Sequence, residues 1–245
     1  LGYHWGEGET LAELGDTLVM LGEYTLADES LRRAEGQLAR FGYTLEEQNC
    51  TLLRTHLYCY LGAYQTARQW LARVFQNPIL QDSAWLTLVA RLTSATLAYQ
   101  TGDYTAVVAD TTAALQVSER LGTPLLQVSG LILLGHAYAA LAQWAAAEQP
   151  YVQARALAQQ LANPALDAEA CAGLALVALA GGKPAHAFTQ IEALLPRLQN
   201  NGAVGLHEPF FVYLATYRVL HAVGDQRAVG VLTAGYAELQ RYATG

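Results

Sequence analysis

A short turn signature recurs along this chain of 245 residues and constrains its fold more than any other feature. Its copies are Gly22-Glu23-Tyr24, Gly62-Ala63-Tyr64, Gly102-Asp103-Tyr104, Ala142-Gln143-Trp144, Gly182-Lys183-Pro184 and Gly224-Asp225-Gln226. The first five copies are 40 residues apart, and the last follows after 42. A fixed period in this range is typical of stacked supersecondary units that bury their apolar faces against one another. The sequence therefore predicts an all-α, right-handed α-solenoid of about six helix-turn-helix units.

Apolar and small residues repeat at helical spacing inside these units. In the first unit the stripe is Leu11, Leu14, Gly15 and Leu18, and in the fourth it is Leu131, Leu134, Gly135 and Tyr138, followed by Ala147, Tyr151 and Ala154. A side chain larger than glycine at Gly15 or Gly135 would force the two helices of a hairpin apart. The pattern therefore predicts that the first and fourth hairpins close most tightly at these glycines, whereas the second unit has Thr55 at the equivalent position.

The period also predicts where units begin and end. We expect one continuous domain with units at about 1–40, 41–80, 81–120, 121–160, 161–202 and 203–245. Gly42 and Gly122 suit the left-handed residue that ends a helix, and Thr123 and Asn163 suit N-caps before a proline. We interpret residues 1–8 as the tail of a junction, which predicts a piece of a longer polypeptide. Pro150 falls inside a predicted helix and is expected to bend it.

The pattern resembles the tetratricopeptide repeat, in which a large residue, Leu-Gly and Tyr mark the first helix and Ala, an aromatic residue and Ala mark the second. The pitch of 40 is longer than the usual ~34, which lengthens each helix. Units of this length, with a junction such as Leu1 to Gly6, resemble the repeat domains of MalT-like activators and related bacterial STAND-type ATPases and transcriptional regulators. The resemblance implies a sensor or docking arm whose nucleotide-binding domain is separate.

Charge and cysteine content exclude several kinds of partner and site. The net charge is −7, and ten of the 21 acidic residues lie in the first 50 positions with only three arginines. Scattered basic residues offer no continuous stripe for phosphates, so we expect no direct nucleic-acid contact. Polar residues interrupt every apolar run, so no membrane span is expected. Cys50, Cys59 and Cys171 form no close pair, which favours buried thiols in a reducing cytoplasm.

The tetratricopeptide register predicts which side chains of the first helices line a concave groove. These residues are Asp16, Asn49, His56, Tyr60, Thr96, Tyr99, Gln100, His136, Glu169, Arg218 and His221. Aromatic faces supply contact area and sparse polar groups fix orientation, so the groove suits a protein, a peptide or a small effector. The leading hypothesis is a non-catalytic binding scaffold, and the alternative is a structural module that self-associates into a homo-oligomer.

Catalytic and metal-binding readings find little support in the sequence. His56 and His136 occupy the same position two units apart, which is too far for the short bonds of a zinc site. His207-Glu208 lacks the second histidine of a zincin helix, and Gly181-Gly182-Lys183-Pro184 lacks the earlier glycine and the Ser or Thr of a phosphate loop. No nucleophile elbow is present. We therefore expect no metal, no cofactor and no enzymatic activity in this segment.

Overall fold

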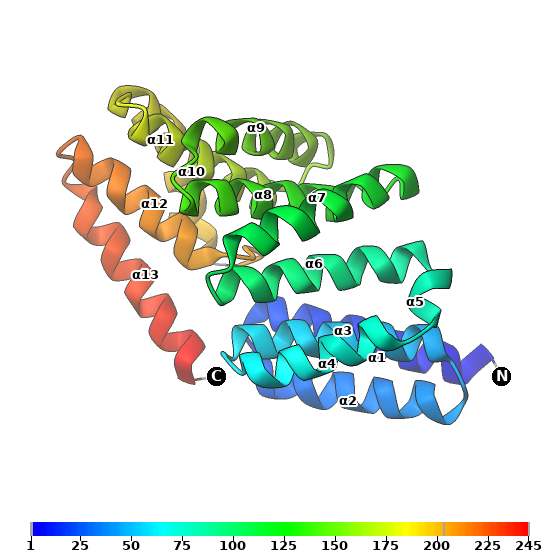
Figure 1. Cartoon of the computed structure of the whole chain (residues 1–245). Helices are drawn as coiled ribbons and strands as arrows, with labels where there is room; N and C mark the ends of the chain where they lie inside the picture. The colour runs from blue at the N-terminus through cyan, green and yellow to red at the C-terminus, as the bar shows by residue number, and fades with distance from the viewer. Residues whose placement is uncertain (1, 203, 245) are drawn as a thin grey trace. The chain divides into compact units, whose positions relative to one another are not determined.

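The structure is a computed structural model that describes residues 2–202 and 204–244, with side chains described for 4–202 and 204–241 (Figure 1). Every regular element in these residues is a helix, as the sequence predicts. Contacts between helices divide the chain into two compact units. Unit 1 extends to Gly122, and unit 2 begins at Thr123.

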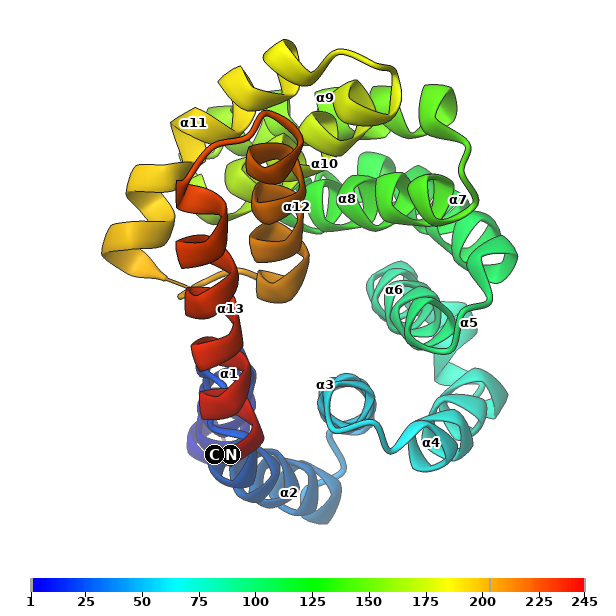
Figure 2. The same cartoon turned by 90° about the vertical axis from the view of Figure 1, so that its left-hand side faces the viewer.

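Unit 1 consists of three helical hairpins and one short inserted helix. Its helices are α1 (Gly2–Leu21), α2 (Tyr24–Arg40), α3 (Thr44–Tyr60), α4 (Tyr64–Gln76), α5 (Ile79–Asp82), α6 (Ala84–Gln100) and α7 (Tyr104–Leu121). We call the first helix of each hairpin (α1, α3, α6) an A-helix and the second (α2, α4, α7) a B-helix. Each A-helix packs on the B-helix of its own hairpin, and α3 also packs on α1, α2 and α6. Figure 2 shows α3 and α6 on one side of the unit and α2 and α4 on the other.

Unit 2 repeats this arrangement. Its A-helices are α8 (Pro124–Ala140), α10 (Pro164–Ala180) and α12 (Pro209–Ala222), and its B-helices are α9 (Trp144–Gln160), α11 (Pro184–Asn201) and α13 (Arg227–Thr244). The six predicted hairpins are therefore present. Most helices have 17 or 18 residues, in agreement with the long pitch, whereas α4 has 13 and is followed by α5 before Ser83 caps α6.

Helices end at the predicted turns, where the first residue of the turn has a left-handed backbone conformation. Gly22, Gly62, Gly102, Gly182 and Gly224 all have φ between 70° and 81°. Glycine adopts this region without the steric penalty that a Cβ brings. In the fourth unit the same position is occupied by Ala142, with φ 58°.

The predicted junction residues also lie where the sequence places them. Gly42 and Gly122 have φ of 77° and 63°. Thr123 and Asn163 are the N-cap residues before Pro124 and Pro164, and the side chain of Asn163 accepts from the backbone N–H groups of Ala165 and Leu166. The sequence was sufficient to predict these helix ends, because a helix cap involves only residues that are neighbours in the chain.

Glycines let the hairpins close, as predicted. A Cβ at Gly15 would lie 2.5 Å from Leu31 of α2, and one at Gly135 would lie 2.6 Å from the ring of Tyr151. Gly173 of α10 makes an equally close approach to this ring, at 2.4 Å. Tyr151 of α9 is fully buried, so its ring fills the space that two glycines on neighbouring A-helices leave open.

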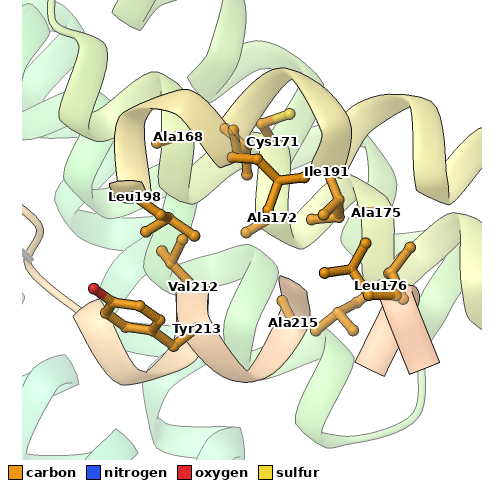
Figure 3. Close-up of a cluster of buried hydrophobic side chains, with 14 of the residues drawn as sticks. Ala168, Cys171, Ala172, Ala175, Leu176, Ile191, Leu198, Val212, Tyr213 and Ala215 are labelled. Carbon is orange, nitrogen blue, oxygen red and sulfur yellow. The ribbon is translucent and has the colours of Figure 1, made fainter. Parts of the chain in front are cut away.

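The core of unit 2 depends on small residues of α10 (Figure 3). Its buried residues include Ala168, Ala172 and Ala175, and the larger Ile191 of α11 and Val212 of α12 pack against them. Because alanine is small, α11 and α12 both approach α10 closely. This packing explains the high alanine content that the sequence shows in this unit.

Two expectations about individual segments need correction. Residues 2–8 belong to α1 rather than to a junction, while Leu1 lies outside the described residues. Leu14 is 47% exposed, because Leu11, Gly15 and Leu18 form the stripe that faces α2 and Leu14 falls at its edge. Pro150 lies inside a helix as predicted, since α9 extends from Trp144 to Gln160, and the bend expected there stays a prediction.

Candidate functional site

The helix register of α3 determines which of its side chains face away from the core. Cys50 and Leu57 pack against α2, and Leu52 and Cys59 belong to the cluster with α4 and α6. Asn49, His56 and Tyr60 are separated by seven and four residues, so they share a different face. All three side chains are partly exposed. The residues predicted to line a groove in α3 therefore share one accessible face.

The neighbouring A-helices present equivalent positions. Glu9 and Asp16 of α1 lie 40 residues before Asn49 and His56, and Thr96 of α6 lies 40 residues after His56. Since α3 packs on both α1 and α6, these faces adjoin. We call this surface the A-helix surface of unit 1. Its residues are Trp5, Glu9, Asp16, Glu46, Asn49, His56, Tyr60, Val89, Thr96, Tyr99 and Gln100.

Aromatic rings concentrate near the carboxyl ends of the A-helices. The Tyr60 ring contacts the ring of His56 edge-on, with centroids 5.0 Å apart, and stacks with Tyr24 of α2 at 6.4 Å. Tyr99 contacts Tyr104 of α7 edge-on at 5.8 Å. These contacts hold the rings in place, and a rigid aromatic side chain contributes contact area at little cost in conformational entropy.

Carboxylates gather near the other end of the same surface. The indole Nε1 of Trp5 donates to Oε1 of Glu46 at 3.0 Å. Burial raises the pKa of Glu9, and the charges of Glu46 and Glu13 raise it further. The negative charges therefore lie close enough to repel one another.

The arginines of unit 1 are on other faces. Arg54 of α3 reaches between the B-helices, where it binds Asp28 at 3.3 Å and also Glu35, and its guanidinium lies 4.3 Å from the ring centroid of Trp70. Arg91 of α6 pairs with Asp110 of α7 at 3.2 Å. The others belong to α2, α4 and α7, namely Arg32, Arg33, Arg40, Arg68, Arg73 and Arg120. None of the eight therefore lies on the A-helix surface of unit 1.

A small pocket opens on the opposite side of α6. It has a volume of about 290 Å³ and lies between α4 and α6, where Leu71, Phe75 and Leu97 supply apolar walls. Two polar groups of its lining already have partners within the protein. The Ser94 hydroxyl donates to Asp110 at 2.7 Å, and the Asp103 carboxylate accepts from the backbone N–H of Ala106.

Two residues predicted for the groove are buried in unit 2, which corrects the sequence-based expectation. His136 is 2% exposed, with its Nδ1 2.7 Å from the hydroxyl of Tyr151 and its ring centroid 4.1 Å from that of Phe211 of α12. Burial lowers the pKa of His136 to about 3, so its ring is neutral. The ring of Phe211 from α12 thus packs on His136 of α8 and covers this position of the A-helix face.

Glu169 of α10 is also buried, with 1% of its surface exposed. Its Oε1 accepts from the backbone N–H groups of His207 and Glu208, just before α12 begins. Glu169 therefore caps a helix of the next hairpin instead of facing a ligand. The two other predicted residues, Arg218 and His221 of α12, are exposed, and the His221 ring stacks on Tyr217 at 5.6 Å.

Sequence reasoning missed several residues around the surface. Trp5, Glu9, Glu46 and Val89 were not predicted, although the 40-residue register could have indicated Glu9 and Val89 from Asn49. Trp5 was assigned to a junction, and no sequence signal connects it with Glu46, 41 residues later. The stacking of Tyr24 on Tyr60 likewise joins two hairpins and leaves no local signal.

Thiol and metal chemistry receive no support from the described residues. Cys50, Cys59 and Cys171 are buried, and burial raises the pKa of each thiol, to about 12, 12 and 11. At neutral pH they are protonated and unreactive. Within residues 4–202 and 204–241, no three His, Cys, Asp or Glu side chains form a group suited to a metal ion. In the described part of the chain, every helix is too short or too polar to traverse a lipid bilayer.

Comparisons with known proteins show similarity in structure. No protein-family model matches the chain, and no curated protein matches it in sequence. The apo form of RapI is similar with a TM-score of 0.65 and 12% identity, over 96% of this chain and 64% of RapI. BtubC from P. vanneervenii has a TM-score of 0.65 and 17% identity, over 88% of this chain and 89% of BtubC.

A third similar structure is PH0952 from Pyrococcus horikoshii, a signal transduction ATPase with numerous domains (STAND) that carries a tetratricopeptide repeat sensor. Its TM-score is 0.61 and its identity 14%, over 96% of this chain and 36% of PH0952. The chain thus spans less than two thirds of the length of RapI and of PH0952. Together with the six hairpins, these similarities show that the chain has an all-α, tetratricopeptide-like repeat fold.

Proposed function

We propose that this chain is a non-catalytic scaffold that binds a protein or peptide partner in the cytoplasm through the A-helix surface of unit 1. The observation that carries the proposal is the row of partly exposed aromatic and hydrogen-bonding side chains across three adjoining helices, including Asn49, His56, Tyr60, Thr96 and Gln100. A surface of this kind gives an extended peptide both contact area and fixed hydrogen-bond partners.

The larger context of this scaffold is a signalling or transcription-regulating protein. PH0952 is described as a signal transduction ATPase whose repeat part is a sensor, and this chain matches 36% of it. By analogy of fold, our chain acts as the sensor or docking part, and it contacts no nucleic acid itself. The acidic composition supports the second point.

Selection of binding peptides tests the proposal. Peptides are selected from a random library on the intact chain, and their affinities are measured by fluorescence anisotropy. We expect Tyr60→Ala combined with Tyr99→Ala to weaken binding at least about tenfold, because tyrosine is enriched among the interface residues whose truncation costs about 1 kcal/mol or more. Phe75→Ala is the matched control, since Phe75 is an exposed ring on α4. Equal affinity for the wild type and the double variant would refute the assignment.

Self-association is the alternative role, and a second measurement distinguishes it from the binding of a separate partner. Light scattering across a range of protein concentrations reports the mass of the particle. If the particle mass doubles as the protein concentration rises, and the Tyr60→Ala and Tyr99→Ala substitutions do not change this behaviour, the result favours a self-associating structural module. A ligand screen by melting temperature would reveal a small effector instead, and Phe75→Ala would then place it in the pocket between α4 and α6.

A further inference from the structure

The two units differ sharply in charge. Unit 1 carries 14 acidic side chains and eight arginines, whereas unit 2 carries seven acidic side chains and six cationic ones. Two of the arginines of unit 1, Arg54 and Arg91, are bound to carboxylates of the B-helices α2 and α7. The other six arginines lie on the B-helices, so among the described residues of unit 1 the charged side chains of the A-helix surface are acidic.

The position of the carboxylates makes this charge useful for recognition. Glu9 and Asp16 lie on α1, and Glu46 lies at the start of α3, beside Trp5. Burial is the main cause of the raised pKa of Glu9, and the charge of Glu46 raises it further, as expected from repulsion between two nearby carboxylates. A cation placed between them would relieve this repulsion and would gain attraction from both groups.

The aromatic residues on the same surface favour the same kind of ligand. The faces of Trp and Tyr rings attract ammonium and guanidinium groups. The protein itself provides an example, because the guanidinium of Arg54 lies over the ring of Trp70. Trp5, Tyr60 and Tyr99 place rings at both ends of a surface whose charged groups are acidic.

We infer that the segment bound by the A-helix surface of unit 1 is a basic peptide, rich in arginine or lysine, that lies across α1, α3 and α6. The inference rests on the proposed function and specifies the partner of that site. Carboxylates pair with the cationic groups, and the rings cover their aliphatic stems. The A-helix face of unit 2 offers no equivalent, because His136 and Glu169 are buried and Arg218 is exposed.

Three peptides that differ only in charge test the inference on the intact chain. Each is a fluorescein-labelled 12-residue peptide in which Leu alternates with Arg, Gln or Glu, and its dissociation constant is measured by anisotropy. We expect the Arg peptide to bind at least about tenfold more tightly than the Gln peptide at 50 mM salt, and this advantage to shrink at 200 mM salt because ions screen exposed charges.

Charge-neutralising variants show whether binding depends on the carboxylates of the A-helix surface or only on the net charge of the protein. Glu9→Gln combined with Glu46→Gln should weaken the Arg peptide about fivefold or more. The matched control is Glu29→Gln combined with Glu119→Gln, which changes the net charge equally on exposed positions of α2 and α7 and should change affinity less than twofold. Equal losses in both double variants would overturn the inference, since binding would then depend only on net charge.

The outcomes also separate this inference from the proposed function. If the Gln or Glu peptide binds as tightly as the Arg peptide, and Tyr60→Ala with Tyr99→Ala abolishes that binding, the surface is a binding site and its preference for cations is wrong. If none of the three peptides and no selected library peptide responds to the tyrosine substitutions, the proposed function itself fails.

Discussion

Tyr151 shows how one side chain connects two hairpins. Its ring lies against Gly135 of α8 and Gly173 of α10, and its hydroxyl is 2.7 Å from Nδ1 of His136. The sequence indicated the contact with Gly135 through the tetratricopeptide pattern. The contact with Gly173 joins two different hairpins and has no local signature in the sequence.

The space beside Tyr151 gives the first prediction. Gly173→Ala would place a Cβ 2.4 Å from the buried ring, so the free energy of unfolding should fall by about 1–3 kcal/mol. Gly230→Ala on α13 is the control, because a Cβ there meets nothing within 4 Å and alanine favours a helix. Urea denaturation measures both, and a Gly173→Ala protein as stable as the wild type would contradict the packing described.

The left-handed backbone at Ala142 gives the second prediction. A non-glycine residue in this conformation is strained by about 1–2 kcal/mol. Glycine removes this strain, but it also makes the unfolded chain more flexible, which offsets part of the gain in stability. Ala142→Gly should therefore raise the free energy of unfolding by about 0.5–1 kcal/mol. Ala146→Gly, inside α9, should lower it by a similar amount. A loss of stability in both variants would show that Ala142 is unstrained.

At the scale of elements, the contact between α10 and α12 depends on a buried carboxyl. Glu169 accepts from the N–H groups of His207 and Glu208, and Arg197 of α11 donates to the carbonyl of Val204 in the same loop at 2.7 Å. The two bonds to Glu169 satisfy backbone N–H groups just before α12, and the bond from Arg197 connects α11 with the same loop. One side chain from the preceding hairpin thus holds the last hairpin in place.

Burial makes this contact sensitive to pH. It raises the pKa of Glu169 to about 7, although the two N–H groups and Arg197 act in the opposite direction. Burial and the charge of Glu169 raise the pKa of Glu208 to about 7 as well. Both groups hold protons more tightly in the folded protein than in the unfolded one. Their contribution to stability is therefore greatest below pH 4.5 and is lost as the pH rises to about 7.

Comparison with a variant isolates this effect from that of His136, whose lowered pKa acts in the opposite direction. Between pH 5 and 7, the wild type should lose about 1–2 kcal/mol more of its unfolding free energy than Glu208→Gln does. The control is Glu192→Gln on α11, an exposed residue whose profile should parallel the wild type. Urea denaturation at each pH gives the values, and identical profiles for wild type and Glu208→Gln would disprove the coupling.

At the scale of the whole molecule, the division into two compact units predicts which helices a destabilising substitution affects. Repeat arrays owe their stability to contacts between neighbouring hairpins. Leu134→Ala removes a buried side chain of α8 and should lower the stability of its unit by about 2–5 kcal/mol. Hydrogen exchange should quicken in α8–α13 and much less in α1–α7. Equal acceleration throughout the chain would show that the two units unfold as one.

The sequence alone was sufficient to predict the hairpins, their turns and the close approach at Gly15 and Gly135. These features depend on residues that are neighbours in the chain or face each other within one hairpin, so their signals are local and recur with the period. The same register correctly placed Asn49, His56 and Tyr60 on an accessible face of α3. Their part in binding stays a prediction.

Only the tertiary structure decided which polar residues of the A-helices remain accessible. His136 and Glu169 occupy positions that the register assigns to a groove, yet contacts with Phe211 and with the loop before α12 bury them. The partners lie 75 and 38 residues away, in other hairpins. Burial depends on how closely neighbouring hairpins approach, and this distance is set by the combined size of side chains from several helices, which no single repeat encodes.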